Sequence, residues 1–134
     1  MNLVLDSCAI IAYLHNETGA DVVDGLMLDR GNVCFVHAIN LCEVYYEAKR
    51  GGGEERAQAT LAVVRRAGLV IREDMDDDLW QQAGRIKADY RRVSLADCFC
   101  AALANRLGAE VVTGDRHELE AIAGAGICRV RFIR

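Results

Sequence analysis

The sequence contains no proline, and only 6% of its 134 residues are aromatic. It also lacks any apolar run long enough to cross a bilayer, which argues against a membrane-spanning protein. No basic segment precedes the first apolar run, so we expect no signal peptide and a cytoplasmic location. There is no internal repeat, low-complexity segment or linker, and we therefore expect residues 1–134 to form one domain.

Lysine is scarce, with two residues against 14 arginines, and the formal net charge is -4. A chain of this charge is not expected to coat nucleic acid through bulk electrostatic attraction. The charge still allows an enzyme whose acidic residues are gathered in one metal site. Arginine suits phosphate because its planar fork makes bidentate contacts, although a GC-rich genome explains most of the arginine excess.

Neither a CxxC pair nor a histidine at zinc-finger spacing accompanies the six cysteines. A structural zinc site is therefore not expected. All six thiols lie among apolar residues, so we expect them to be buried and reduced. They are Cys8, Cys34, Cys42, Cys98, Cys100 and Cys128.

Short apolar segments alternate with helical patterns along the whole chain. The expected strands are 3–5, 33–36, 69–71, 110–113 and 129–132. The expected helices are 7–14, 20–28, 38–50, 54–67, 76–89, 94–107 and 116–123. Ser7 is the expected N-cap of the first helix, and Gly51–Gly53 is an expected flexible turn. Because the strands are apolar throughout, we predict an α/β fold with three layers, in which helices flank a central, mostly parallel sheet.

Four carboxylates stand in or beside apolar segments, where an unpaired charge costs stability. The segments are LVLD with Asp6, AINLCEVYY with Glu43, SLADCFCAALA with Asp97 and VVTGD with Asp115. Each acid has an ordinary structural explanation. The first and the last could cap the helices that follow them, and Asp97 could be a first-turn residue favoured by the helix dipole. Glu43 could point to solvent or pair with Lys49 or Arg50.

Taken together, the four acids favour another interpretation. Asp6 and Asp115 follow strands, at the sheet edge where open α/β folds hold their ligands. Glu43 and Asp97 lie in the N-terminal halves of helices that can reach the same edge. Gathered carboxylates repel one another unless a cation lies among them, and ligands that are all oxygen select Mg²⁺ or Mn²⁺. The pattern therefore predicts a metal site suited to phosphodiester hydrolysis.

At these four segments the chain resembles the PIN domain, and most of all the VapC-type toxins of bacterial and archaeal toxin–antitoxin pairs. The matching pieces are LVLDSCAIIAYL, INLCEV, SLADCFCAALA and VVTGDRHEL, in the family's order over essentially the full chain. The resemblance implies a Mg²⁺- or Mn²⁺-dependent endoribonuclease. It also implies that Asp6, Glu43, Asp97 and Asp115 form the acidic quartet, with Asp6 and Asp97 as the first candidates for direct metal ligands.

The resemblance extends to supporting residues and partners. Thr113 matches a hydroxyl position that supports the site by hydrogen bonding, and Ser7 matches the hydroxyl residue after the first aspartate. The implied partners are an RNA substrate, a second copy of the chain in a homodimer, and a small antitoxin whose tail enters the acidic groove. Arginines beside the motifs could hold the RNA backbone, and Arg116 is the first candidate. Arg50, Arg91 and Arg92 are others, although a solvated surface arginine is the ordinary expectation for each.

Two other classes of function remain open. A PIN-fold module that only binds RNA or protein would be expected to have lost one of the four acids, and all four are present. A receiver-type phosphoacceptor domain would have paired acids near its first strand and a lysine after a late strand. Here Asp6 has no acidic neighbour, and the only lysines are Lys49 and Lys87.

Overall fold

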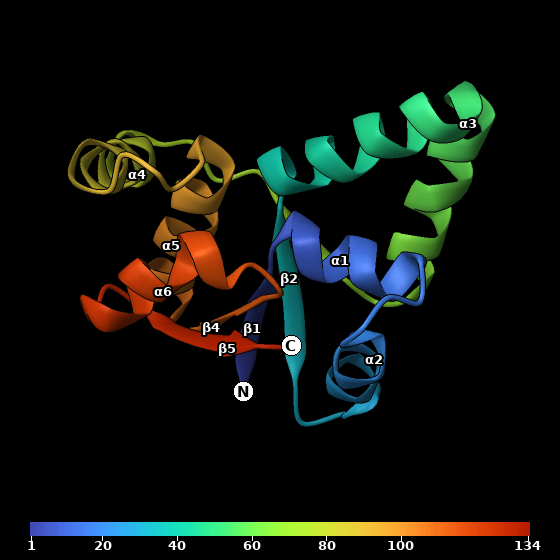
Figure 1. The fold of residues 1–134 in the computed structure, drawn as a ribbon, viewed down its shortest axis with the longest axis horizontal. Coiled ribbons are helices and arrows are strands. Elements are labelled where there is room, and N and C mark those ends of the chain that lie inside the picture. The colour runs from blue at the N-terminus through green and yellow to red at the C-terminus, as the bar shows by residue number, and fades with distance from the viewer.

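The structure, a computed structural model, describes residues 1–134. Five strands form one sheet in the order β3-β2-β1-β4-β5, and every neighbouring pair is parallel (Figure 1). The strands are β1 (Asn2–Leu5), β2 (Val33–His37), β3 (Val70–Arg72), β4 (Glu110–Thr113) and β5 (Arg129–Phe132). The prediction of a parallel α/β sheet is thus confirmed.

Six helices cover the two faces of the sheet. They are α1 (Ser7–Leu14), α2 (Ala20–Leu28), α3 (Ala38–Arg66), α4 (Asp77–Asp89), α5 (Leu95–Leu107) and α6 (Arg116–Gly124). In Figure 1, α1, α2 and α3 lie on one side of the sheet, and α4, α5 and α6 lie on the other. The helices and the sheet therefore make the three layers expected from the sequence.

The hydrophobic core follows from the alternation of side chains along buried strands. Leu3 and Leu5 of β1 belong to the core cluster that α1 to α3 share with the sheet. Val4, between them, belongs to the cluster formed with α4 to α6. All three are at most 1% exposed, so β1 is covered on both faces, which is why its sequence is apolar throughout.

Two local predictions were wrong in detail. Asp6, and not Ser7, is the N-cap of α1, because the Asp6 Oδ1 accepts a hydrogen bond from the Ala9 N–H at 2.8 Å. The expected turn at Gly51–Gly53 is reduced to one non-helical residue, Gly53, with φ 80° and ψ -175°, and the helix continues through Gly51 and Gly52. Only glycine adopts this backbone conformation readily, so Gly53 sets the kink in α3.

The six cysteines are all free, as expected, but they are not all buried. Cys34, Cys98 and Cys100 are buried, whereas Cys42 is exposed on α3. The apolar neighbours of Cys42 in sequence lie on the other face of the helix, as the buried Leu41 and Val44 show.

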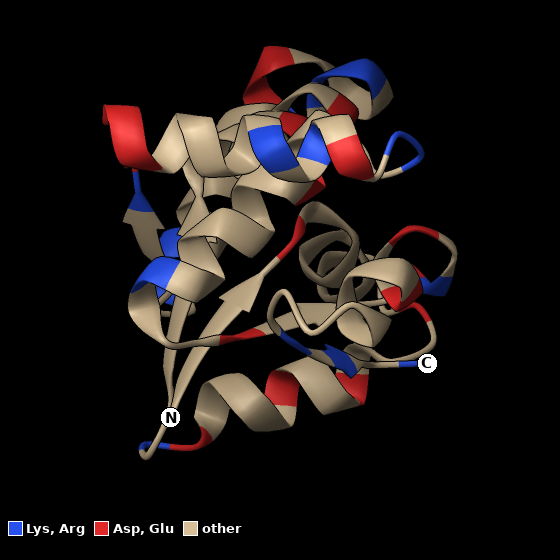
Figure 2. Cartoon of the chain, turned by 90° about the vertical axis from the view of Figure 1, so that its left-hand side faces the viewer, with Lys and Arg blue, Asp and Glu red and all other residues tan.

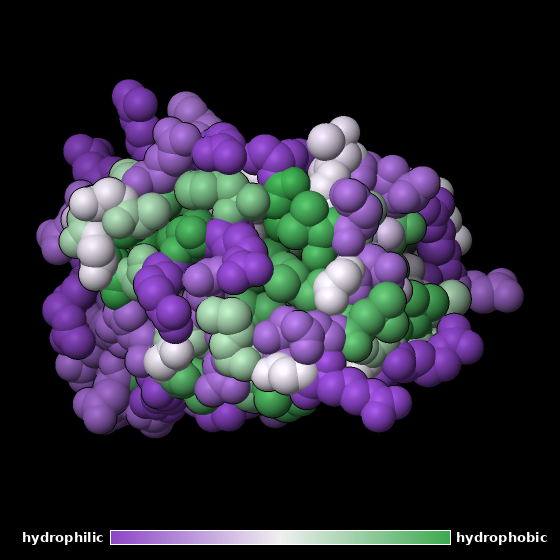
Figure 3. Space-filling model, turned by 90° about the horizontal axis from the view of Figure 1, so that it is seen from below, coloured by the Kyte–Doolittle hydropathy of each residue, from purple (hydrophilic) through white to green (hydrophobic).

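The strand order reverses at β1, because β2 lies on one side of it and β4 on the other. Open α/β sheets bind ligands outside the carboxyl ends of their strands at such a point. At the opposite end of the strands the surface is mixed, with hydrophobic side chains gathered among hydrophilic ones (Figure 3). The exposed Met1, Leu28 and Val33 belong to this end. None of the helices combines the length and the apolar character that a membrane crossing requires.

Candidate metal centre

A cavity of about 160 Å³ opens at the carboxyl ends of β1 and β4. It is lined by five carboxyl groups, two hydroxyls and one thiol, and no lysine, arginine or histidine lines it. All four acids singled out in the sequence are among the lining residues. The lining residues are Asp6, Ser7, Cys8, Glu43, Ser94, Asp97, Asp115 and Glu118.

Asp6 lies at the floor of this cavity, directly after β1, and is 1% exposed. One carboxyl oxygen caps α1, but the other, Oδ2, is buried without any hydrogen-bond partner. Burial is the main cause that raises the pKa of Asp6 to about 7; the charges of Asp115 and Glu43 act in the same direction, and the Thr113 hydroxyl and the Ala9 N–H act against it. The capping explanation therefore accounts for one oxygen of Asp6 and leaves the second without a role inside the protein.

Glu43 comes to the cavity from the second turn of α3. Its Oε1 accepts a hydrogen bond from the Ser7 hydroxyl at 3.0 Å, and its Oε2 lies 3.4 Å from the Tyr46 hydroxyl. Neither Lys49 nor Arg50 forms an ion pair with it, and the Arg50 guanidinium lies instead over the Tyr46 ring. Ser7 thus orients Glu43 across the gap between α1 and α3.

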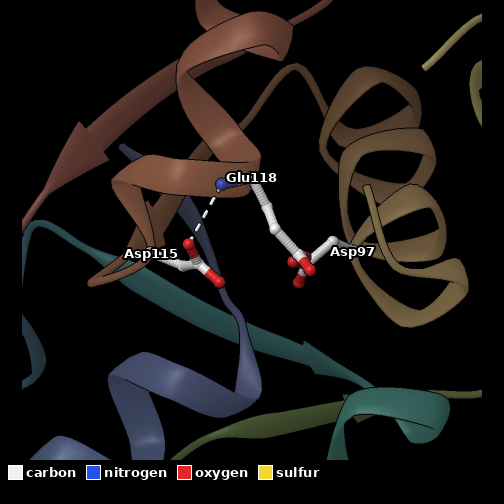
Figure 4. A group of neighbouring side chains, drawn as sticks. All are labelled: Asp97, Asp115 and Glu118. Carbon is white, nitrogen blue, oxygen red and sulfur yellow. Dashed lines mark hydrogen bonds between the residues drawn. The ribbon is translucent and has the colours of Figure 1, made fainter. Parts of the chain in front are cut away.

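Asp97 and Glu118 face each other from the first turns of α5 and α6, with their carboxyl groups side by side in Figure 4. Burial raises the pKa of Asp97 well above its usual range, and the adjacent Glu118 raises it further. A hydrogen bond from Asp97 lowers the pKa of Glu118. Of the two carboxyl groups, Asp97 therefore takes up a proton more readily than Glu118.

Asp115 is the N-cap of α6, which was one explanation of this acid in the sequence. It also lines the acidic cavity. Its Oδ1 accepts a hydrogen bond from the Glu118 N–H at 3.0 Å (Figure 4). The Asp115 N–H donates to the Thr113 hydroxyl oxygen at 2.9 Å. The buried Thr113 therefore holds the backbone from which Asp115 projects.

The group fits a divalent cation. Carboxyl oxygens of Asp97, Asp115 and Glu118 lie within 4.8 Å of one another, and the unpartnered Oδ2 of Asp6 belongs to the same cavity. Such an all-oxygen donor set suits a hard ion like Mg²⁺ or Mn²⁺. Since no basic side chain lines the cavity, a cation is the available means of compensating these charges together.

Glu118 was missed in the sequence. Its spacing after Asp115, D-x-x-E at a helix start, is the pattern of a capping box, in which the glutamate returns to the backbone of its own N-cap. Here the Glu118 Oε2 accepts instead from the Ser94 N–H, the N-cap of α5, at 3.2 Å. The D-x-x-E pattern is present in the segment TGDRHE, but a capping box is a sufficient explanation of it in the sequence.

Arg116 follows Asp115 in sequence but turns away from the acids. Its Nε donates to the Arg134 carbonyl oxygen at 2.8 Å, and its guanidinium lies 4.5 Å from the centre of the Phe132 ring. It does not line the acidic cavity. A contact between Arg116 and RNA therefore stays a prediction.

Comparison with known proteins supplies a family and a fold. A sequence model of the PIN domain matches residues 3–125. A search of curated proteins finds no match. Solved structures with a similar fold include VapBC2 from Rickettsia felis bound to a DNA fragment from its promoter. That structure has a TM-score of 0.75 at 17% identity, with 98% of each chain covered.

Two further structures are similar over nearly the whole chain. DNA-bound VapBC from Salmonella typhimurium has a TM-score of 0.73 at 22% identity, covering 100% of this chain and 99% of the other. VapC20 from Mycobacterium tuberculosis, described as a sarcin-ricin loop cleaving toxin, has a TM-score of 0.70 at 20% identity, covering 96% and 98%. At these identities the likeness concerns the fold.

Proposed function

The chain belongs to the PIN domain family, and from that premise and the acidic cavity we propose that it is a metal-dependent endoribonuclease. The observation that carries this proposal is a cavity lined by five carboxyl groups without a single basic side chain. The reaction is in-line attack of water on the phosphorus of an RNA phosphodiester, in which one P–O bond forms and another breaks.

In this proposal Asp6, Asp97, Asp115 and Glu43 hold the ion, which is Mg²⁺ or Mn²⁺, and Glu118 joins them. A bound cation of this kind lowers the pKa of water and offsets negative charge on a phosphoryl oxygen. The remaining residues have positioning roles: the Ser7 hydroxyl orients Glu43, and the Thr113 hydroxyl fixes the backbone of Asp115.

Water is the nucleophile that the cavity favours. Burial and the charge of Asp6 raise the pKa of the Cys8 thiol, so Cys8 is not a thiolate at neutral pH. The Ser7 hydroxyl donates a hydrogen bond to Glu43, and no histidine lines the cavity to serve as a base for Ser7. The carboxylates are the groups able to accept a proton from the attacking water.

Cleavage of single-stranded RNA by the purified protein tests this function. We expect cleavage with Mg²⁺ or Mn²⁺ and none with EDTA. Asp6→Asn and Asp97→Asn should abolish cleavage, whereas Asp24→Asn, an exposed acid on α2, should leave it unchanged. Cleavage that persists in Asp6→Asn or Asp97→Asn would discard the metal mechanism, and RNA binding without cleavage would support a binding module.

The resemblance to VapC-type toxins extends the proposal to partners. We propose that the chain is the toxin of a toxin–antitoxin pair, forms a homodimer and is held inactive by a small antitoxin whose tail enters the acidic cavity. A basic side chain on such a tail would meet five carboxyl groups with no cationic partner of their own. The test is whether the product of a neighbouring gene relieves growth arrest caused by this chain.

A further inference from the structure

A second cavity, of about 310 Å³, lies beside the acidic one and has the opposite character. Tyr90, Arg91 and Arg92 line it from the connection between α4 and α5, and His117 lines it from α6. Glu118 lines both cavities, so the two are neighbours across a single side chain. Glu118 therefore separates the acidic cavity from a cationic rim, formed by Arg91 and Arg92, that borders the second cavity.

The connection that carries the two arginines is held in place by hydrogen bonds. The Lys87 ammonium donates to the carbonyl oxygens of Arg91 at 2.9 Å and Val93 at 2.7 Å. The Val93 N–H donates to the Tyr90 carbonyl oxygen at 3.0 Å, and the Val93 side chain is buried. Arg91 and Arg92 therefore project from a fixed turn, which Figure 2 shows as a basic segment at the end of α4.

The guanidinium groups of Arg91 and Arg92 are free. Both residues are exposed, and neither side chain forms a hydrogen bond or an ion pair. Other arginines of the chain are paired: Arg72 and Arg106 bind Asp74, and Arg131 binds Glu110. Two adjacent, unpaired guanidinium forks at a cavity are suited to bidentate contact with phosphate.

The cavity is too large for a phosphate alone and falls at the small end of pockets that hold organic ligands. Tyr90, which is half-buried, supplies an aromatic wall beside the arginines. Aromatic rings stack on nucleobases, and base stacking of this kind tolerates any base. Phosphate donors and a stacking ring in one cavity correspond to the two chemical parts of a nucleotide.

We propose that this cavity binds one nucleotide of single-stranded RNA next to the phosphodiester at the acidic site. Arg91, Arg92 and His117 contact its phosphate, and its base stacks on Tyr90. The inference rests on the proposed ribonuclease function and names the part of the protein that holds the substrate. It also explains how a chain of net charge -4 brings a polyanion to five carboxyl groups, since the cationic rim attracts the strand.

The test measures binding apart from cleavage. The Asp97→Asn protein is titrated onto a fluorescent single-stranded RNA, and its Kd is read from anisotropy at several salt concentrations. Adding Arg91→Gln and Arg92→Gln should raise the Kd roughly tenfold or more. The slope of log Kd against log salt should fall by about 1.4, as expected for the loss of two phosphate contacts on a single strand.

The matched control is Arg65→Gln with Arg66→Gln. These are also adjacent, exposed arginines without an ion pair, at the end of α3, and they line neither cavity. The two double variants change the net charge equally, so an effect of bulk charge would appear in both. At the aromatic wall, Tyr90→Leu should weaken binding several-fold while Tyr90→Phe retains it.

Equal Kd values for the two double variants would overturn the proposal. So would a loss of antitoxin binding in Arg91→Gln/Arg92→Gln without a loss of RNA affinity, because the cavity would then hold a protein segment. These outcomes differ from failure of the ribonuclease proposal. If the wild-type chain binds RNA through Arg91 and Arg92 but never cuts it, the ribonuclease proposal is wrong, whereas the proposal of a nucleotide-binding cavity stands.

Discussion

At the scale of single residues, the acidic site is built at the N-terminal caps of two helices, α5 and α6, and Glu118 of α6 bonds to the N-cap residue of α5. Ser94 with Asp97 and Asp115 with Glu118 both have capping-box spacing, and in each pair the cap side chain accepts the N–H three residues on. Neither Asp97 nor Glu118 accepts a hydrogen bond from the N–H of its own N-cap residue. Glu118 binds the Ser94 N–H, and the Thr113 hydroxyl takes the Asp115 N–H. The carboxyl of Asp97 is thereby left for the cavity.

The hydrogen bond from the Ser94 N–H holds Glu118 at the cavity, and its role as a fifth acid of the site can be tested. Glu118→Gln retains an oxygen for the Ser94 N–H but removes the charge. We expect RNA cleavage to fall about 10- to 100-fold, the usual effect of changing a group at or next to a metal ligand. Cleavage rates over a Mn²⁺ titration should show the loss most strongly at low Mn²⁺ concentration.

Glu120→Gln is the control for this prediction. Glu120 lies on the same helix, is exposed and forms an ion pair with Arg116, at 3.6 Å. The same loss in both variants would mean that α6 is sensitive to any change of charge. Full activity of Glu118→Gln would restrict the site to the four acids singled out in the sequence.

At the scale of secondary-structure elements, glycines act in opposite ways depending on their backbone conformation. Gly53 interrupts α3 at φ 80°, a conformation that an L-residue adopts only at a cost. Gly84 lies in the interior of α4, where a Cβ would meet no atom within 4 Å. The first glycine is required by the fold, whereas the second only adds conformational freedom to the unfolded chain.

Alanine at these two positions should therefore shift the free energy of unfolding in opposite directions. We expect Gly53→Ala to lower it by about 1–2 kcal/mol and Gly84→Ala to raise it by about 0.5–1 kcal/mol. Urea unfolding followed by circular dichroism measures both. A stabilising Gly53→Ala would show that the two halves of α3 can join without the kink.

At the scale of the whole molecule, a group of ion pairs joins the end of α5 to the connection between β3 and α4. Asp74 accepts bidentate hydrogen bonds from Arg72, at 2.8 and 2.9 Å, and a third from Arg106 at 3.1 Å. The backbone oxygen of Asp74 lies 2.9 Å from Nε2 of the buried His37. Arg72 first, and Arg106 with it, lower the pKa of Asp74 to about 2.

This lowered pKa predicts a pH dependence of stability. The folded state holds the carboxylate charged at a pH where the unfolded chain, with a pKa near 3.8, is already protonated. The contribution of Asp74 is therefore complete above about pH 5 and declines as the pH falls toward 2. Because the arginines are partly exposed, we expect about 1 kcal/mol at most.

Urea unfolding of the wild type and of Asp74→Asn measures this contribution. The difference between their free energies of unfolding should be largest at pH 6, shrink at pH 3 and decrease in high salt. Asp24→Asn, an exposed acid in the middle of α2 without an ion pair, should show no such difference. A difference for Asp74→Asn that stays constant from pH 6 to pH 3 would contradict the electrostatic origin.

The sequence by itself determined the fold class and the four acids at the cavity. Short apolar segments followed by helices specify a parallel sheet through local periodicity, and an acid directly after a buried strand must lie at its carboxyl end. Only the tertiary structure decided which groups meet across long stretches of chain. Glu118 reaches the N–H of Ser94 because α5 and α6 begin side by side, and Arg116 turns toward Arg134 because β5 ends beside it. Such contacts depend on how elements pack in space, and no pattern of neighbouring residues encodes them.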